Sequence, residues 1–277
     1  MKPSNLAAHN ITFLTKWSVR YLSALFVASA ASVSAFEYQT KTGMSAGLSF
    51  SNYRYSEPGY MALDGKKIGL ELAGTYAFNS TWPNTGENWM VRGEIRYSNG
   101  KVDYSSNESG TLNDKTDRYN EIRTLIGRDF DLGEYGILTY TGFGTRQLHN
   151  DLRGLSSTGA SGYRRDSRIN YIPVGLTAKT RLRNETAVQT TLEYNYLLRG
   201  VQTVTRSDVS ASLSDLSLNQ PKGFGLRAQT MFLLGQFYVG PSISYLKIDR
   251  SDISGTPPAF EPKNNTFEVA IKAVYQF

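Results

Sequence analysis

Three features of this 277-residue sequence predict an all-β fold, a closed barrel of ten antiparallel strands that crosses a membrane. Short segments alternate apolar and polar side chains with a period of two, as strands do when their two faces meet different surroundings. Segments rich in Gly, Pro, Asn and Ser separate them. The mean hydropathy is −0.38 although 12% of the residues are aromatic, which is typical of a barrel whose lipid-facing and lumen-facing residues cancel in the average.

The N-terminus predicts an export signal. Lys2, Lys16 and Arg20 precede an apolar run over residues 21–31, and Val33-Ser34-Ala35 fits the small-residue rule for cleavage before Phe36. A membrane anchor is the alternative, but the apolar run is shorter than the roughly 20 residues that span a bilayer. We therefore expect residues 1–35 to be a signal peptide and residues 36–277 to be the barrel domain.

Composition excludes several classes of protein. The chain has no Cys, so it has neither disulfides nor a lipid-modified cysteine. Three of its 30 basic residues lie in the signal segment and none of its 24 acidic residues does, which leaves a mature net charge of only +3. Because this balance is close to neutral, it gives little support for nucleic-acid binding.

The first four strands show the alternation clearly. In the first, Met44, Leu48 and Phe50 alternate with small polar residues, and in the third, Trp89 and Ile95 alternate with charged residues. A Lys or Arg that faces lipid at mid-bilayer depth costs about 2–4 kcal/mol in barrels, so the charged face is expected to point into the lumen. The four predicted strands cover residues 43–55, 66–78, 88–104 and 117–130.

The remaining six strands are predicted with two reservations. The fifth has no clear alternation, and Gly142 and Gly144 mark a bend or close packing there. The ninth contains Pro241, which requires a bulge or a locally unpaired position because Pro cannot donate to a ladder. The facing of these two strands is left open. The six strands cover residues 135–148, 168–181, 186–199, 223–234, 237–247 and 266–277.

The connections alternate in length. Those after odd-numbered strands are mostly long and polar, over residues 105–115, 150–166, 200–222 and 249–265, whereas those after even-numbered strands are short turns. Both chain ends then lie on the side of the short turns.

The closing strand carries a family resemblance. From Thr266 onward every second residue is apolar or aromatic, and the chain ends Tyr275-Gln276-Phe277. This pattern resembles the closing strand of bacterial outer-membrane β-barrel proteins, in a broad porin-like or opacity-protein-like sense. The resemblance implies a Gram-negative outer membrane, short periplasmic turns, long extracellular loops, and recognition of Tyr275 and Phe277 by the barrel assembly machinery.

Inward-facing charges form the most informative candidate site. They could be the selectivity lining of a pore or an ion-pair network that fills the lumen. The small strand number favours the network, because barrels near eight strands are filled by side chains and open channels appear near sixteen. By parity the set is Glu71, Arg92, Glu94, Arg96, Glu121, Arg123, Lys179, Arg181, Glu193, Arg227, Glu268 and Lys272.

A second candidate site is a basic cluster in the connection over residues 150–166. Arg153, Arg164, Arg165 and Arg168 lie there or at its end. Arg suits bidentate contacts with phosphate, so these residues could contact lipopolysaccharide. A solvated loop is the alternative.

The sequence gives only weak support for a catalytic site or a metal site. His149 and Asp151 resemble, in reversed order, the acid and His pairing of the ten-stranded omptin proteases, but the only Asp-x-Asp, Asp129-Phe130-Asp131, falls at a predicted turn on the opposite side. A lipid hydrolase would need a Ser beside a His, and no spacing singles one out. Residues 113–117 hold too few acids for a calcium loop. We expect no enzyme activity, no cofactor and no metal.

The function expected is that of a surface or structural barrel whose lumen is filled by side chains. A narrow channel for small solutes is the alternative, and a hydrolase at the rim is the least favoured. The expected partners are outer-membrane lipid, lipopolysaccharide and the assembly machinery, with no nucleic acid. The specific ligand and the oligomeric state stay open.

Overall fold

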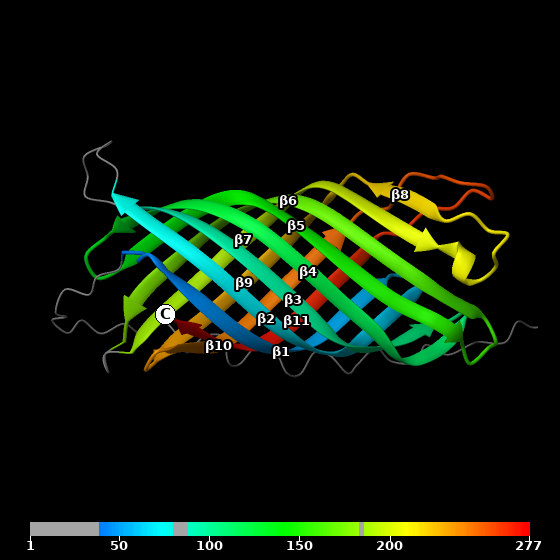
Figure 1. Cartoon of the computed structure of the whole chain (residues 1–277), viewed down its shortest axis with the longest axis horizontal. Coiled ribbons are helices and arrows are strands. Elements are labelled where there is room, and N and C mark those ends of the chain that lie inside the picture. The colour runs from blue at the N-terminus through cyan, green and yellow to red at the C-terminus, as the bar shows by residue number, and fades with distance from the viewer. Residues whose placement is uncertain (1–38, 80–87, 183–185) are drawn as a thin grey trace, which may run out of the picture. The chain divides into compact units, whose positions relative to one another are not determined.

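Antiparallel hydrogen bonds join each strand to its neighbours around a closed sheet in the computed structural model, which describes residues 39–79, 88–182 and 186–277 (Figure 1). The order is β6-β5-β4-β3-β2-β1-β11-β10-β9-β7-β8, and a further pairing of β6 with β7 closes the barrel. The strands are β1 (Gly43–Glu57), β2 (Met61–Asn79), β3 (Asn88–Ser106), β4 (Gly110–Asp131), β5 (Gly136–Leu155), β6 (Ser161–Arg181), β7 (Ala187–Thr205), β8 (Leu216–Gln220), β9 (Gly223–Leu234), β10 (Phe237–Ile248) and β11 (Asn264–Gln276).

Strands β8 and β9 occupy one position in the barrel. Strand β7 pairs with β9 from Val188 to Tyr196 and with β8 from Gly200 to Val204, in the same antiparallel direction. Pro221 and Lys222 separate the two pieces, and a Pro has no backbone N–H to donate to the ladder. The described sheet is therefore a barrel of ten strands, one of them interrupted, and the predicted fold class is confirmed.

The connections at the far end from the C-terminus differ from the expectation. Residues 105–106 and 110–115 belong to β3 and β4, and residues 150–155 and 161–166 belong to β5 and β6. Most of the two predicted loops is therefore strand. The expectation was wrong because outward residues beyond the membrane are polar, which removes the lipid-driven alternation, whereas the backbone pairing continues. We call this end the loop side and the opposite end the turn side.

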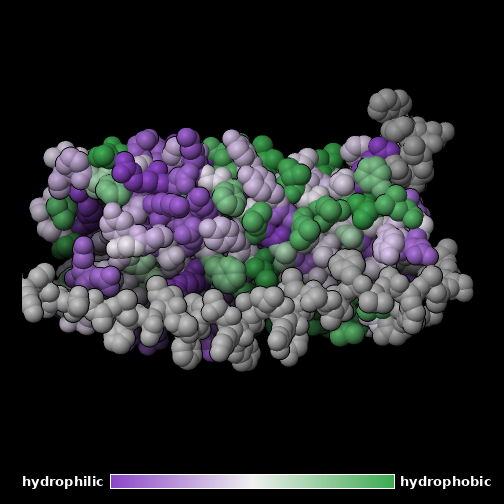
Figure 2. Space-filling view, turned by 180° about the vertical axis from the view of Figure 1, so that it is seen from behind, coloured by the Kyte–Doolittle hydropathy of each residue, from purple (hydrophilic) through white to green (hydrophobic). Residues whose placement is uncertain are grey.

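The longer connections on the loop side carry some structure. The third contains a short 3-10 helix, η1 (Arg206–Asp208), and β8. None of the helices in the described ranges is long and apolar enough to cross a membrane. On the face shown in Figure 2, hydrophilic residues gather toward the loop-side end. The described strands β2 to β7 have 19 to 22 residues, about twice the 9–11 that a bilayer requires.

The facing of the two undecided strands is now clear. Leu138, Tyr140 and Leu148 of β5 are buried in the lumen, whereas Phe143 is exposed on the outer wall. The fifth strand showed no alternation because its lumen face also carries apolar residues. In β10, Phe237 and Ile243 face outward.

The structure also explains how Pro241 is tolerated in a strand and why a glycine stands at position 142. The β9–β10 ladder skips Gly240 and Pro241, so the missing N–H of Pro241 costs no pair there. A Cβ on Gly142 would lie 2.0 Å from the carbonyl oxygen of Thr124, which confirms close packing at this glycine.

Candidate functional site

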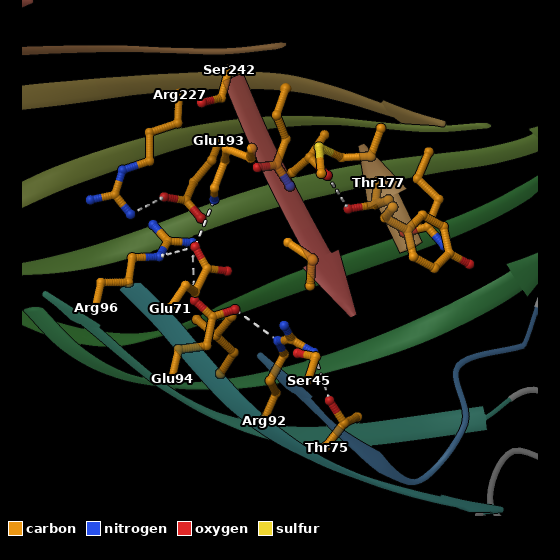
Figure 3. Close-up of a pocket in the computed structure, with 18 of the residues that line it drawn as sticks. Ser45, Glu71, Thr75, Arg92, Glu94, Arg96, Thr177, Glu193, Arg227 and Ser242 are labelled. Carbon is orange, nitrogen blue, oxygen red and sulfur yellow. Dashed lines mark hydrogen bonds and ion pairs between the residues drawn. The ribbon is translucent and has the colours of Figure 1, made fainter. Parts of the chain in front are cut away.

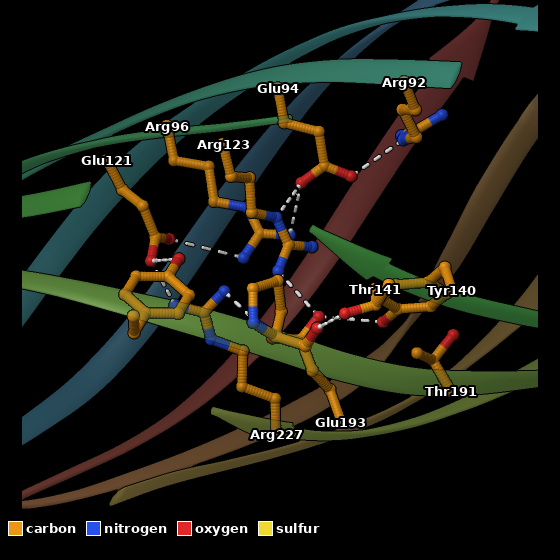
Figure 4. Close-up of polar contacts among 12 residues, drawn as sticks. Arg92, Glu94, Arg96, Glu121, Arg123, Tyr140, Thr141, Thr191, Glu193 and Arg227 are labelled. Carbon is orange, nitrogen blue, oxygen red and sulfur yellow. Dashed lines mark hydrogen bonds and ion pairs between the residues drawn. The ribbon is translucent and has the colours of Figure 1, made fainter. Parts of the chain in front are cut away.

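Nine charged side chains from six strands meet in the lumen, and Figure 4 shows Arg92, Glu94, Arg96, Glu121, Arg123, Glu193 and Arg227 among them. Cross-strand register brings opposite charges together, because Glu71 lies opposite Arg96, Glu94 opposite Arg123, and Glu193 opposite Arg227. Such directly opposed pairs are the closest side-chain neighbours on one face of a sheet. We call these nine residues the lumen network: Glu71, Arg92, Glu94, Arg96, Glu121, Arg123, Glu193, Arg227 and Lys272.

Every member of the lumen network has an ion pair. Arg96 Nε lies 3.0 Å from Glu71 Oε2, Lys272 Nζ lies 2.6 Å from the same oxygen, and Arg123 Nη1 lies 2.6 Å from Glu193 Oε2. Other ion pairs join Glu94 to Arg92, Arg96 and Arg123, and Arg227 to Glu121 and Glu193. The pairs link into one continuous set, which is what buried charges require.

Two tyrosines complete the lumen network by lying across glycines of the neighbouring strand. Tyr171 lies opposite Gly144 and donates to Glu121; Tyr140 lies opposite Gly175 and donates to Glu193 at 2.8 Å. A Cβ on Gly144 or Gly175 would come within 2.3 Å of the tyrosine ring. The two glycines are therefore what lets each hydroxyl reach a buried carboxylate.

The other three predicted charges lie apart from the lumen network. Glu268 accepts hydrogen bonds from Ser51 (2.6 Å) and Tyr119 (3.4 Å). Lys179 pairs with Asp129 at 2.9 Å, and Arg181 is the last residue of β6.

A second buried charge pair, absent from the sequence prediction, lies on the loop side of the lumen network. Lys67 and Asp117 form an ion pair with both side chains 0% exposed. The Lys67 ammonium lies 3.3 Å from the centre of the Tyr53 ring, and Asn150 donates to Asp117. Parity could have found both, since Lys67 is four residues before Glu71 and Asp117 four before Glu121, so each shares the inward face.

The loop-side end of the lumen holds a third charged cluster. Arg165 Nη2 lies 2.5 Å from Glu57 Oε1 and also contacts Glu261, while the Tyr55 hydroxyl donates to Glu57 at 2.8 Å. The Arg165 side chain is only 6% exposed. The expectation that Arg165 contacts lipopolysaccharide from a loop is therefore wrong, because Arg165 points inward from strand β6.

The other three arginines of that predicted cluster point outward at different places. Arg153 pairs with Asp151 at 2.7 Å and Arg164 pairs with Asp208 at 2.8 Å. Arg168 is exposed on the outer wall of β6. They do not form one cluster with Arg165.

A cavity of about 590 Å³ occupies the turn-side half of the lumen (Figure 3). Its lining includes the apolar residues Met90, Leu125 and Leu138, which pack together, and the polar residues Ser45 and Ser242. The lumen network borders the cavity, and Figure 3 shows Arg92 bonded to Glu94 and Thr75 beside it.

Residues just before β1 cross the turn-side mouth of this cavity. The Thr40 backbone N–H donates to Asp129 of β4 at 2.8 Å, and Lys179 of β6 donates to the Thr40 hydroxyl at 2.9 Å. Gln39 accepts a hydrogen bond from Asn88 at 2.9 Å. A second cavity, lined in part by Glu121 and Arg227 of the lumen network, measures only about 20 Å³, room for about one water molecule.

The residues that prompted the protease comparison lie far apart. His149 Nδ1 is 2.8 Å from Asp166 Oδ1 on the outer wall, whereas Asp129 is buried in the lumen with Lys179 at the turn side. Among the described residues, no group of three or more His, Cys, Asp or Glu could hold a metal ion.

The Glu57–Arg165–Glu261 cluster predicts a pH effect on the β10–β11 connection. Burial, only partly offset by Arg165 and reinforced by Glu57, raises the pKa of Glu261 to about 7. The folded state therefore binds a proton that the unfolded chain releases near pH 4.5, and the connection loses stability as the pH rises through about 7. We expect hydrogen-exchange protection of the Ser251 and Glu261 amides, corrected for the intrinsic rate, to fall by up to tenfold per pH unit between pH 5 and 7.

Glu261→Gln should make this protection independent of pH, whereas Glu108→Gln, in the exposed β3–β4 turn, should leave the wild-type slope. Equal slopes in the wild type and in Glu261→Gln would contradict the assignment.

The closed sheet, its lipid-like outer wall and its charged interior define a transmembrane β-barrel protein. The chain matches the model of the outer membrane protein beta-barrel domain over residues 23–210, and it belongs to that family. It is an integral β-barrel protein of the outer membrane. Comparison with curated protein sequences gives no match.

Solved structures of outer-membrane proteins align with this chain. The outer membrane protease OmpT from Escherichia coli aligns with a TM-score of 0.55 and 10% identity, over 87% of this chain and 100% of that one. The attachment invasion locus protein Ail of Yersinia pestis aligns with a TM-score of 0.34 and 12% identity, over 86% of this chain and all of Ail. At 10% identity the likeness to OmpT concerns the fold alone.

Proposed function

We propose that this protein is a non-conducting surface barrel of a Gram-negative outer membrane, with no enzymatic activity of its own. The observation that carries the proposal is the filling of the lumen on the loop side of the lumen network. Lys67, Asp117, Leu63 and Val102 are each at most 1% exposed there. A solute that crossed the barrel would have to displace these side chains.

The energetics favour a closed state. Tyr53, Tyr55, Leu63, Val102, Leu112 and Leu152 form one buried apolar cluster inside the loop-side half of the barrel. Opening a path would separate this packing and also expose or unpair buried charges, each of which is costly when it loses its partner.

Single-channel recording in planar bilayers tests the proposal. We expect the refolded wild-type protein to insert without stable conductance steps. Steady, ion-selective openings would overturn the proposal and support a narrow channel. The turn-side cavity of about 590 Å³ is the observation that favours this second candidate, because part of the lumen already has space for water.

Export and assembly belong to the same proposal. We propose that residues 1–35, which lie outside the described residues, act as the signal peptide. Phe277 donates its backbone N–H to Met44 at 2.9 Å, and the Tyr275 ring contacts the rings of Phe237 and Phe277 at 5.1 and 4.9 Å. These contacts support a role for the last residues in closing the barrel and in recognition by the assembly machinery.

Deletion of Phe277 should lower the amount of protein in the outer membrane and leave misfolded chain in the periplasm, measured by membrane fractionation and immunoblotting. Deletion of Glu108, at a turn on the other end, serves as a control for the loss of one residue. Normal insertion of the chain without Phe277 would contradict an assembly role.

A further inference from the structure

A ring of basic side chains surrounds the outer wall of the barrel. We propose that this ring binds the phosphate groups of lipopolysaccharide in the outer leaflet. The inference rests on the outer-membrane location and on the loop side facing outward, and it is independent of whether the lumen conducts. The ring, which we call the basic belt, consists of Arg54 (β1), Lys66 (β2), Lys101 (β3), Arg118 (β4), Arg168 (β6), Arg199 (β7) and Lys247 (β10).

The register places these residues at one level. Lys66 lies directly opposite Lys101. Arg118 lies opposite Asn99 of β3, which is two residues before Lys101. On its other side Arg118 lies opposite His149 of β5. Arg168 lies opposite Gln147, which is two residues before His149. Strands in a barrel are tilted by about 35–45°, so a level ring must step along the register by about one residue per strand. The steps of zero and two residues fit that slope.

The same stepping continues around the barrel. Arg199 lies opposite Asn170, two residues after Arg168. Lys247 lies opposite Phe224 of β9 and Asn265 of β11. Arg54 lies opposite Phe267 of β11, which is two residues after Asn265. The belt therefore includes seven of the ten strand positions.

The charge of the belt is mostly unneutralised. Lys66, Arg118, Arg168 and Arg199 are exposed and form no ion pair within the described ranges. Arg54 pairs with Asp64 at 3.4 Å, but both side chains are more than half exposed, and an exposed pair of this kind is weak. Outward acids such as Asp64, Asp103 and Asp166 lie two residues farther toward the loop side than Lys66, Lys101 and Arg168.

The belt lies where a headgroup layer would be. Trp89 marks the turn-side aromatic end of β3, and the twelve residue steps from Trp89 to Lys101 correspond to a height of about 30 Å for a tilted strand. The apolar band of outer-membrane barrels is about 25 Å tall and is flanked by aromatic residues at both interfaces. Aromatic residues lie beside the belt or on its membrane side: Phe224 and Phe267 are directly opposite Lys247 and Arg54, and Tyr97, Tyr196 and Tyr245 lie nearer the turn side.

Phosphate is the partner that this arrangement fits. Arg forms bidentate hydrogen bonds with phosphate, and Lys contributes a point charge. Each basic residue near a negatively charged membrane surface contributes about 1 kcal/mol to the binding free energy. A lipid that carries two phosphates can contact belt residues on several strands at once, whereas a single phosphate reaches only an adjacent pair such as Lys66 and Lys101.

Binding of bisphosphorylated lipid A tests the proposal. The refolded wild-type protein is titrated in neutral detergent, and bound lipid is counted by native mass spectrometry. Replacing Lys66, Lys101 and Arg118 together by Gln should weaken binding about tenfold or more. A charge-matched control, Lys115, Arg153 and Arg206 replaced by Gln nearer the loop-side tips, should bind as the wild type does. Dephosphorylated lipid A should bind weakly to all three proteins.

Retained heat-modifiable migration on gels verifies that the variants fold. If the triple belt variant does not fold, Arg168→Gln with Arg199→Gln tests the other side of the belt in the same assay. Wild-type affinity in a folded belt variant, or equal binding of phosphatidylglycerol and bisphosphorylated lipid A by the wild type, would overturn the proposal. A conducting wild type would contradict the proposed function and leave this inference standing.

Discussion

Lys67→Met should destabilise the barrel by about 3–5 kcal/mol, the cost of leaving one member of a buried ion pair without its partner. The Asp117 carboxylate would remain in the interior with the neutral donor Asn150. Water could not solvate this carboxylate, because its side chain is 0% exposed. Equilibrium unfolding by urea in lipid vesicles measures the change. The midpoint should shift without a change in slope if the same surface is exposed on unfolding.

Two further variants separate charge from packing. Lys66→Met changes the adjacent residue, which points outward, and should alter stability by less than about 0.5 kcal/mol. Lys67→Met combined with Asp117→Leu removes both charges and should recover most of the lost stability, since apolar replacement of a buried pair is often neutral or stabilising. If the double variant is as unstable as the single one, packing against Tyr53 rather than the ion pair accounts for the loss.

Arg92→Ala with Arg123→Ala should open the lumen network. Arg123 pairs with Glu94 and Glu193 across the barrel, and Arg92 joins Glu94 to Thr75 beside the turn-side cavity. Their removal leaves two buried carboxylates with fewer partners and widens the space that borders the cavity. We expect intermittent leak currents in planar bilayers or a fall of several degrees in the thermal midpoint, where the wild type shows neither.

Arg128→Ala is the matched control for this experiment. Arg128 lies on the same strand as Arg123 but points outward, where its guanidinium lies 5.6 Å from the centre of the Trp89 ring and 5.2 Å from that of Phe130. Its loss should leave the lumen closed. Leak currents of equal size in Arg128→Ala would indicate general disturbance of the membrane rather than opening of the network.

The period-two pattern and the turn segments together predicted the ten strand positions, because lipid contact forces one face of most strands to be apolar; the fifth was placed without a clear alternation. The strand ends were less predictable. On the loop side the outward residues contact water, so the apolar signal stops near Lys101 and Arg118 although the ladder continues to Ser106 and Gly110. Arg165 was assigned to a loop for this reason.

Parity along each strand predicted twelve charges on the lumen side, and nine of them meet in the lumen network, because successive side chains of a strand point to opposite faces whatever the neighbours are. Which charges pair was decided only by the register of the closed sheet, since Glu193 and Arg123 come from strands that do not adjoin one another. The buried position of Lys67 beneath Tyr53 and the level of the basic belt depend on the same closure. A local sequence pattern determines the face of a residue, whereas its height and its partners across the barrel exist only after the strands have been tilted and joined.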